Sequence, residues 1–80
     1  MKRFLITGGA GFIGGNFVAK VLREELGKVL VLDKLTYAGH RATLRPWEGH
    51  PAYHFVQGDI GDRQLVQRLL PEFRPTYIVN

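Results

Sequence analysis

The chain has 80 residues, of which 45% are apolar and 22% charged, and its formal net charge is +4. This length fits one small domain at most, and the absence of cysteine and serine excludes disulfides, thiolate zinc sites and cysteine or serine nucleophiles. The lysines and arginines are spread along the chain, without the basic stripe and interleaved aromatic residues typical of nucleic-acid binding, so we expect no nucleic-acid partner.

The first half of the chain predicts a strand, a helix and a second strand. Residues 2–7 contain a continuous apolar run, which is typical of a strand buried on both faces. After a glycine-rich segment, apolar residues recur at helical spacing. Gly27 stands where this helix would end in a left-handed cap. Residues 29–32 form a second all-apolar strand, which Asp33 closes. The residues expected on the buried helix face are Ile13, Phe17, Val18, Val21, Leu22 and Leu26.

The second half repeats the alternation of strand and helix. A short helical turn is expected around residues 41–44, before Pro46, Gly49 and Pro51 break the chain. A third strand is expected at residues 53–57. A second amphipathic helix then begins at its N-cap Asp62, and Pro71 should kink or shorten it. Residues 77–79 start a fourth strand.

Strands that alternate with helices predict an α/β protein with parallel pairing. We expect a Rossmann-type doubly wound sheet with strand order 3-2-1-4, of which residues 1–80 supply only the first half. The chain is therefore expected to be the N-terminal portion of a larger doubly wound domain.

The glycine-rich segment lies directly between the first strand and the first helix. Gly9, Gly11 and Gly14 fit G-x-G-x-x-G, and Gly8, Gly11 and Gly14 fit G-x-x-G-x-x-G. In a dinucleotide fingerprint, glycines allow the tight turn, the close approach of backbone N–H groups to a pyrophosphate, and helix–strand packing. The helix N-terminus adds unpaired donors and a positive dipole end. The alternative is a glycine-rich turn without a ligand.

Two acids follow the second and third strands. Asp33 stands about 20 residues after the glycines, where a carboxylate accepts both ribose hydroxyls of an adenosine and repels a 2′-phosphate. This favours NAD over NADP, although Lys34 is a neighbouring cation that could receive that phosphate. In the 3-2-1-4 order, Asp59 could reach the adenine amino group and Ile60 could pack on the base. The alternatives are a turn-forming aspartate at position 33 and an ordinary polar turn at position 59.

No catalytic constellation is visible. His50 and His54 are separated by Pro51, and no third ligand converges with them, so we expect no metal site. Neither Tyr37 nor Tyr53 is followed four residues later by lysine. The apolar runs are far shorter than the roughly 18 residues of a membrane span, and no signal-peptide pattern precedes the first of them. We expect a cytoplasmic protein without membrane contact.

The segment T-G-G-A-G-F-I-G at residues 7–14 resembles the opening of the extended short-chain dehydrogenases/reductases of the NAD-dependent epimerase/dehydratase family. The run L-D-K-L-T-Y-A-G at residues 32–39 and G-D-I at residues 58–60 resemble, more narrowly, the dTDP-glucose 4,6-dehydratases of that family. Gly15 departs from the pattern, because relatives usually carry serine there. The resemblance spans all 80 residues, which would be about the first quarter of such an enzyme.

The resemblance implies tightly bound NAD that oxidises a sugar at C4, loss of water across C5–C6, and return of the hydride at C6. It implies dTDP-glucose as substrate, a homodimer, and catalytic residues beyond Asn80. A related sugar-nucleotide epimerase or reductase, or a stand-alone dinucleotide-binding module, remains an alternative. The resemblance places Phe12 and Ile13 against the pyrophosphate, Asp33, Lys34, Leu35 and Thr36 around the ribose, and Asp59, Ile60, Ala38 and Gly39 at the adenine pocket.

Overall fold

The computed structural model describes residues 2–8, 12–34 and 40–79. Four strands alternate with helical segments along the chain, as expected. The strands and helices are β1 (Lys2–Thr7), α1 (Phe12–Arg23), β2 (Gly27–Asp33), the 3₁₀ helix η1 (His40–Trp47), β3 (Tyr53–Gln57), α2 (Arg63–Phe73) and β4 (Tyr77–Val79).

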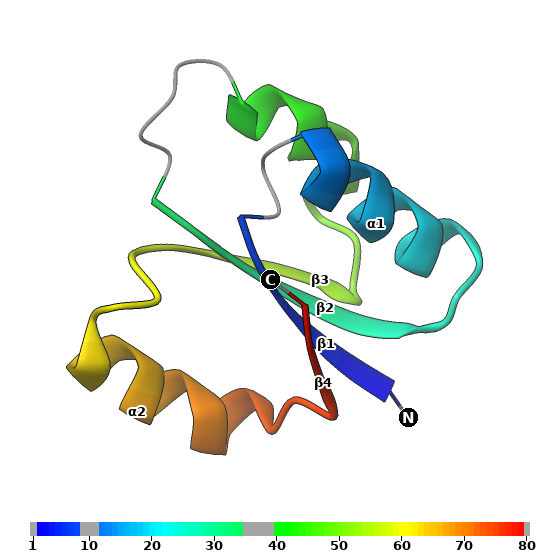
Figure 1. Ribbon diagram of the computed structural model, residues 1–80. Coiled ribbons are helices and arrows are strands. Elements are labelled where there is room, and N and C mark those ends of the chain that lie inside the picture. Colours follow the sequence, from blue (N-terminus) through cyan, green and yellow to red (C-terminus); the bar gives the residue numbers. More distant parts are fainter. Residues whose placement is uncertain (1, 9–11, 35–39, 80) are drawn as a thin grey trace.

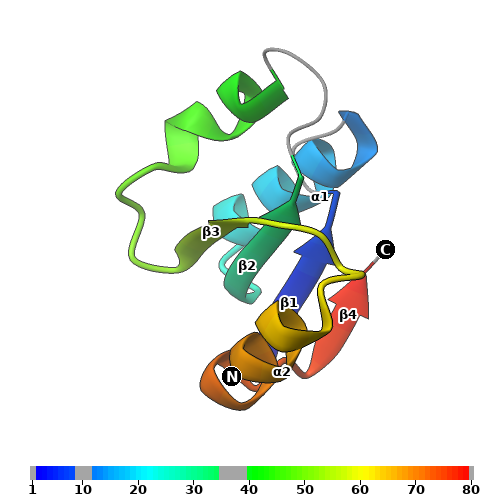
Figure 2. The same ribbon diagram turned by 90° about the vertical axis from the view of Figure 1, so that its left-hand side faces the viewer.

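All four strands pair in parallel in the order β3-β2-β1-β4. Helices α1 and η1 cover one face of this sheet and α2 covers the other (Figure 1), and the turned view shows the same separation (Figure 2). This arrangement confirms the expected α/β fold and strand order. It follows from the apolar runs of β1 and β2, which need cover on both faces.

The hydrophobic core has two layers, one on each face of the sheet. Toward α1 and η1 the sheet contributes Phe4, Ile6, Val29 and Val31, and toward α2 it contributes Leu5, Leu30 and Leu32. Because neighbouring residues of a strand point to opposite faces, each strand supplies both layers. Full burial of a valine or leucine side chain stabilises the fold by about 1.5–3 kcal/mol. The helical residues buried against these layers are Val18, Val21, Leu22, Leu44 and Leu69.

Helix α1 buries a shorter stripe than its sequence predicts. Val18, Val21 and Leu22 are buried as expected, but Ile13 is 83% exposed and Leu26 39% exposed. Ile13 lies in the first turn of the helix and Leu26 lies beyond its end, so neither belongs to the stretch that packs on the sheet. The expectation that both residues lie on the buried face was wrong.

The prediction that Gly27 forms a left-handed cap was also wrong. The residue with positive φ after α1 is Glu25 (φ 53°). The Leu26 N–H donates to the Val21 carbonyl at 2.9 Å and the Glu25 N–H to the Leu22 carbonyl at 3.4 Å, which is the hydrogen-bond pattern of a Schellman cap. Gly27 instead opens β2 beside Lys2, where a Cβ would collide with the Lys2 carbonyl oxygen. Glycine is required at position 27 because β1 and β2 approach closely there.

Pro46 and Pro71 do not end the helices in which they lie. Pro46 lies inside η1, which continues to Trp47, and Pro71 lies inside α2, which continues to Phe73. Asp62 caps α2 as predicted, because its carboxylate accepts a hydrogen bond from the Leu65 N–H at 3.2 Å.

A cluster of hydrogen bonds joins the start of β1 to the segment that leads into β4. The Arg3 N–H donates to the Thr76 hydroxyl at 2.8 Å, and that hydroxyl donates to the Arg3 carbonyl at 3.2 Å. The Arg3 guanidinium donates to the Arg74 carbonyl at 2.6 Å, and Arg74 itself ends α2 in a left-handed conformation. These bonds fix where the chain enters the short strand β4.

Replacing Gly27 with alanine should destabilise the protein by about 1–3 kcal/mol, because the new methyl group has to push β2 away from the Lys2 carbonyl. The thermal unfolding midpoint of the protein measures this, with Lys28→Ala as an exposed control in the same strand. A Gly27→Ala midpoint equal to that of the control would show that the two strands separate without cost.

Replacing Thr76 with valine should loosen β4, because valine keeps the shape of threonine but removes both hydroxyl hydrogen bonds to Arg3. We expect the amides of β4 to exchange with deuterium roughly three- to tenfold faster. Thr76→Ser keeps the hydroxyl and should preserve the original rate. Equal exchange in the valine and serine variants would contradict the assigned role of the hydroxyl.

Candidate functional site

The carboxyl ends of β1, β2 and β3 lie at one edge of the sheet (Figure 1). The strand register pairs Thr7 with Leu32 and Asp33 with Gln57, so the three strands end at nearly the same level. The Gly8 N–H donates to the Leu32 carbonyl at 3.0 Å, and the Gly58 N–H donates to the Asp33 carbonyl at 2.9 Å. The turns after β1 and β3 are therefore both hydrogen-bonded to the end of β2. We call this side of the sheet, where the strands end, the carboxyl edge.

The turn after β1 brings the first glycine of the fingerprint to the carboxyl edge. Gly8 has φ +70°, a conformation that side chains disfavour, and apart from its chain neighbours no described residue has a heavy atom within 4 Å of where a Cβ would lie. Helix α1 begins at Phe12, carries Ile13 and Gly14 in its first turn, and has no acid there. Its first backbone N–H groups have no acceptor within the helix. Gly11, another predicted site residue, lies outside the described residues.

Asp33 is the last residue of β2 and is only 4% exposed. It is the single buried charged residue in the described part of the chain. A buried carboxylate is stable only with hydrogen-bond partners, and no buried polar side-chain atom in that part lacks one. The strand thus presents an acid at the level where the sequence predicts the ribose of a dinucleotide. Leu35, Thr36, Ala38 and Gly39, which the resemblance adds to this region, lie outside the described residues.

An ion pair between Lys34 and Asp59 joins the ends of β2 and β3. The Lys34 ammonium lies 3.0 Å from Oδ2 of Asp59, and both side chains are about half exposed. The other carboxylate oxygen of Asp59 accepts the Gly61 N–H at 2.9 Å. This backbone hydrogen bond, and then the Lys34 ammonium, lower the pKa of Asp59. Asp59 therefore keeps its negative charge to a lower pH than an ordinary aspartate.

Sequence reasoning placed Lys34 and Asp59 separately and missed their pairing. The D-x-G spacing of Asp59 and Gly61 is a recognisable turn signal, because aspartate often accepts a backbone N–H two residues on. The ion pair has no such local signal, since it depends on the register between β2 and β3.

Two large apolar side chains are exposed at the starts of the segments that follow β1 and β3. Ile13 stands in the first turn of α1, and Ile60, which is 51% exposed, follows Asp59. Sequence reasoning assigned both to a bound dinucleotide. Exposed isoleucines are costly to solvate, and their positions are compatible with burial under a ligand.

The described residues contain no group of three metal-ligating side chains. His50 is occupied otherwise, because its Nδ1 accepts the Ala52 N–H at 3.0 Å. His54 lies edge-on to Phe73, with ring centroids 6.5 Å apart. No helix in the same described part is long and apolar enough to cross a membrane.

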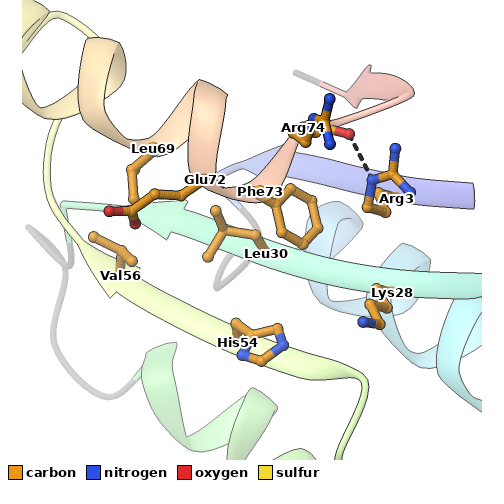
Figure 3. Close-up of a pocket in the computed structure, with 9 residues that line it drawn as sticks. All are labelled: Arg3, Lys28, Leu30, His54, Val56, Leu69, Glu72, Phe73 and Arg74. Carbon is orange, nitrogen blue, oxygen red and sulfur yellow. Dashed lines mark hydrogen bonds between the residues drawn. The ribbon is translucent and has the colours of Figure 1, made fainter.

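A cavity of about 500 Å³ lies between α2 and the face of the sheet that α2 covers (Figure 3). Leu69 and Phe73 of α2 stand over Leu30 and Val56 of the sheet (Figure 3). Arg3, Lys28 and His54, from the first half of their strands, complete the lining with Glu72 and Arg74. Because doubly wound sheets bind ligands outside the carboxyl ends of their strands, we assign the candidate site to the carboxyl edge and not to this cavity.

Comparison with known proteins identifies the family of the chain. Residues 4–80 match the model of the NAD dependent epimerase/dehydratase family. The dTDP-glucose 4,6-dehydratase of Xanthomonas campestris pv. campestris (strain B100) is 51% identical over 80 residues, which are all of this chain and 22% of that protein. The chain thus spans about a fifth of the length of the curated relatives it matches.

Two solved structures resemble the fold closely. The dTDP-glucose 4,6-dehydratase from Bacillus anthracis str. Ames in complex with NAD is 40% identical with a TM-score of 0.94, covering 100% of this chain and 26% of that one. DesIV, the dTDP-glucose 4,6-dehydratase from Streptomyces venezuelae with NAD and TYD bound, is 49% identical with a TM-score of 0.78, covering 85% of this chain and 23% of that one. With its fingerprint turn, its acid after β2 and these matches, the chain belongs to the NAD-dependent epimerase/dehydratase family.

Proposed function

We propose that this chain is the N-terminal, NAD-binding portion of a dTDP-glucose 4,6-dehydratase. The observation that carries the proposal is the carboxyl edge, where Gly8 follows β1, buried Asp33 ends β2 and Asp59 follows β3. Support also comes from the whole-chain similarity to dTDP-glucose 4,6-dehydratases, two of whose structures contain NAD.

The carboxyl edge suits the pyrophosphate of a dinucleotide. Gly8 has no Cβ, and apart from its chain neighbours no described residue comes within 4 Å of where one would lie. The first turn of α1 carries no acid that would repel an anion, and a helix N-terminus offers free N–H groups and a positive dipole end. We assign Gly8, Gly11, Phe12, Ile13 and Gly14 to the pyrophosphate.

The acids after β2 and β3 suit the adenosine half of the cofactor. We assign Asp33, at the end of β2, to the ribose hydroxyls, because a carboxylate only accepts hydrogen bonds and hydroxyls donate them. We assign Leu35 and Thr36 to the same ribose, and Lys34 as well, through its main chain and not through its ammonium. Asp59 and the exposed Ile60 follow the neighbouring strand β3, and we assign them to the adenine, with Ala38 and Gly39 lining its pocket.

In the proposed reaction, dTDP-glucose is oxidised at C4, loses water across C5–C6 and is reduced at C6, giving dTDP-4-keto-6-deoxyglucose. NAD supplies the hydride acceptor and donor for these steps. The part played by this chain is to bind and orient the cofactor. The groups that move protons on the sugar belong to other parts of the enzyme, which we propose to be a cytoplasmic homodimer.

Incubating the full-length protein with dTDP-glucose and NAD tests the proposed activity. We expect a product that is lighter by one water molecule in the mass spectrum and carries a ketone at C4. A product of unchanged mass with inverted stereochemistry would indicate an epimerase instead. Recovery of unchanged sugar from a protein that binds NAD would favour a binding module.

Replacing Asp33 with asparagine should weaken NAD binding by the full-length protein about tenfold, because a hydrogen bond to a charged acceptor contributes about 1.5–3 kcal/mol and the amide retains part of it. Calorimetric titration of the cofactor-free protein measures the Kd, with the thermal midpoint as the control for folding. An unchanged Kd, or equal affinity of the original protein for NAD and NADP, would refute the role assigned to Asp33.

A further inference from the structure

The Lys34–Asp59 pair bears on a question of cofactor choice. NAD and NADP differ at the 2′-position of the adenosine ribose, where NADP carries a phosphate. Of the residues after β2, Lys34 is the cation best suited to bind that phosphate, and it directly follows Asp33, the acid that would repel it. Whether Asp33 repels the 2′-phosphate or Lys34 binds it depends on where the ammonium of Lys34 lies.

The structure shows Lys34 held by β3 and the turn that follows it. Its ammonium lies 3.0 Å from Oδ2 of Asp59, and its backbone carbonyl accepts a hydrogen bond from the Gln57 side chain at 3.4 Å. Asp59 is itself fixed, because its Oδ1 accepts the Gly61 N–H at 2.9 Å. The ammonium is thus bound to an acceptor that a backbone hydrogen bond holds in place.

We propose that Asp59 is a positioning residue that holds the Lys34 ammonium away from the 2′-position of the adenosine ribose and so selects NAD over NADP. The inference rests on the proposed function, since it assumes that the cofactor binds at the carboxyl edge. Together Asp33, Lys34 and Asp59 carry a net charge of −1, which disfavours a phosphate dianion but accepts the hydroxyl of NAD. Without the negative charge of Asp59, the net charge of the three residues is zero. The Lys34 ammonium also loses its partner and becomes able to bind the phosphate.

The test compares Kd values of the cofactor-free, full-length protein for NAD and for NADP. In Asp59→Asn the amide oxygen still accepts the Gly61 N–H, but the ion pair is lost. We expect the ratio of the NADP Kd to the NAD Kd to fall roughly five- to tenfold, because the release of Lys34 adds to the removal of a repelling charge. The gain should shrink at high salt, as expected for exposed charges.

Asp62→Asn is the matched control, because it removes a carboxylate three residues away that caps α2 through Leu65 and makes no described ion pair. Asparagine caps helices as well as aspartate does, and the Kd ratio should stay within about twofold of the original. The double variant Asp59→Asn with Lys34→Met should also return to the original ratio, because the gain requires the lysine.

Each outcome decides for or against the selection role. An equal gain in Asp59→Asn and in the double variant would overturn it, because the lysine would then be irrelevant. Lys34→Met alone should raise the ratio less than about twofold, because a lysine held by Asp59 does not reach the phosphate and only its screened charge is lost. A larger rise with an unaltered NAD Kd would overturn the role, because the lysine would then already bind the phosphate in the original protein. A protein in which NAD itself does not bind would refute the proposed function instead, so the two failures are distinguishable.

Discussion

The candidate site depends on the parallel, in-register pairing of β1, β2 and β3. Because Thr7 pairs with Leu32 and Asp33 with Gln57, the three turns that leave the sheet start at the same level. The hydrogen bonds from Gly8 to Leu32 and from Gly58 to Asp33 extend the pairing beyond the strands. A shift by one residue would move every side chain of the shifted strand to the other face, and would also displace Asp33 from its neighbours.

The two acids of the carboxyl edge lie in contrasting environments. Asp33 is buried at the end of the sheet, whereas Asp59 is partly exposed and shares its charge with Lys34 and the Gly61 N–H. The buried carboxylate is fixed by the strand that carries it, and interactions of charges there are stronger than in water. The outer pair is screened by solvent and contributes little to stability. The main effect of the Lys34–Asp59 pair is to position the Lys34 ammonium, and its effect on the stability of the fold is small.

Much of this architecture could be predicted because its signals are local. The apolar runs of β1 and β2, the N-cap Asp62 and the start and end of β3 depend on neighbouring residues, and all agree with the structure. Gly27 was misinterpreted because close approach of two strands and a helix cap both require glycine, and the sequence alone does not separate them. The exposure of Ile13 depends on which part of α1 packs on the sheet, and the Lys34–Asp59 pair depends on strand register. Helical periodicity and strand patterns record neither. The motifs of the carboxyl edge indicated the family, but each side chain's role depends on this non-local geometry.

The hydrogen bonds between Arg3 and Thr76 span 73 residues of sequence. Strand β1, near the start of the chain, lies between β2 and β4 in the finished sheet, so during synthesis it leaves the ribosome long before β4 exists. One side of β1 then has no strand to pair with, and unpaired strand edges promote association between chains. Long-range closure of this kind also slows folding. Nascent chains of this protein should therefore depend on chaperones most in the interval between the emergence of β1 and that of β4.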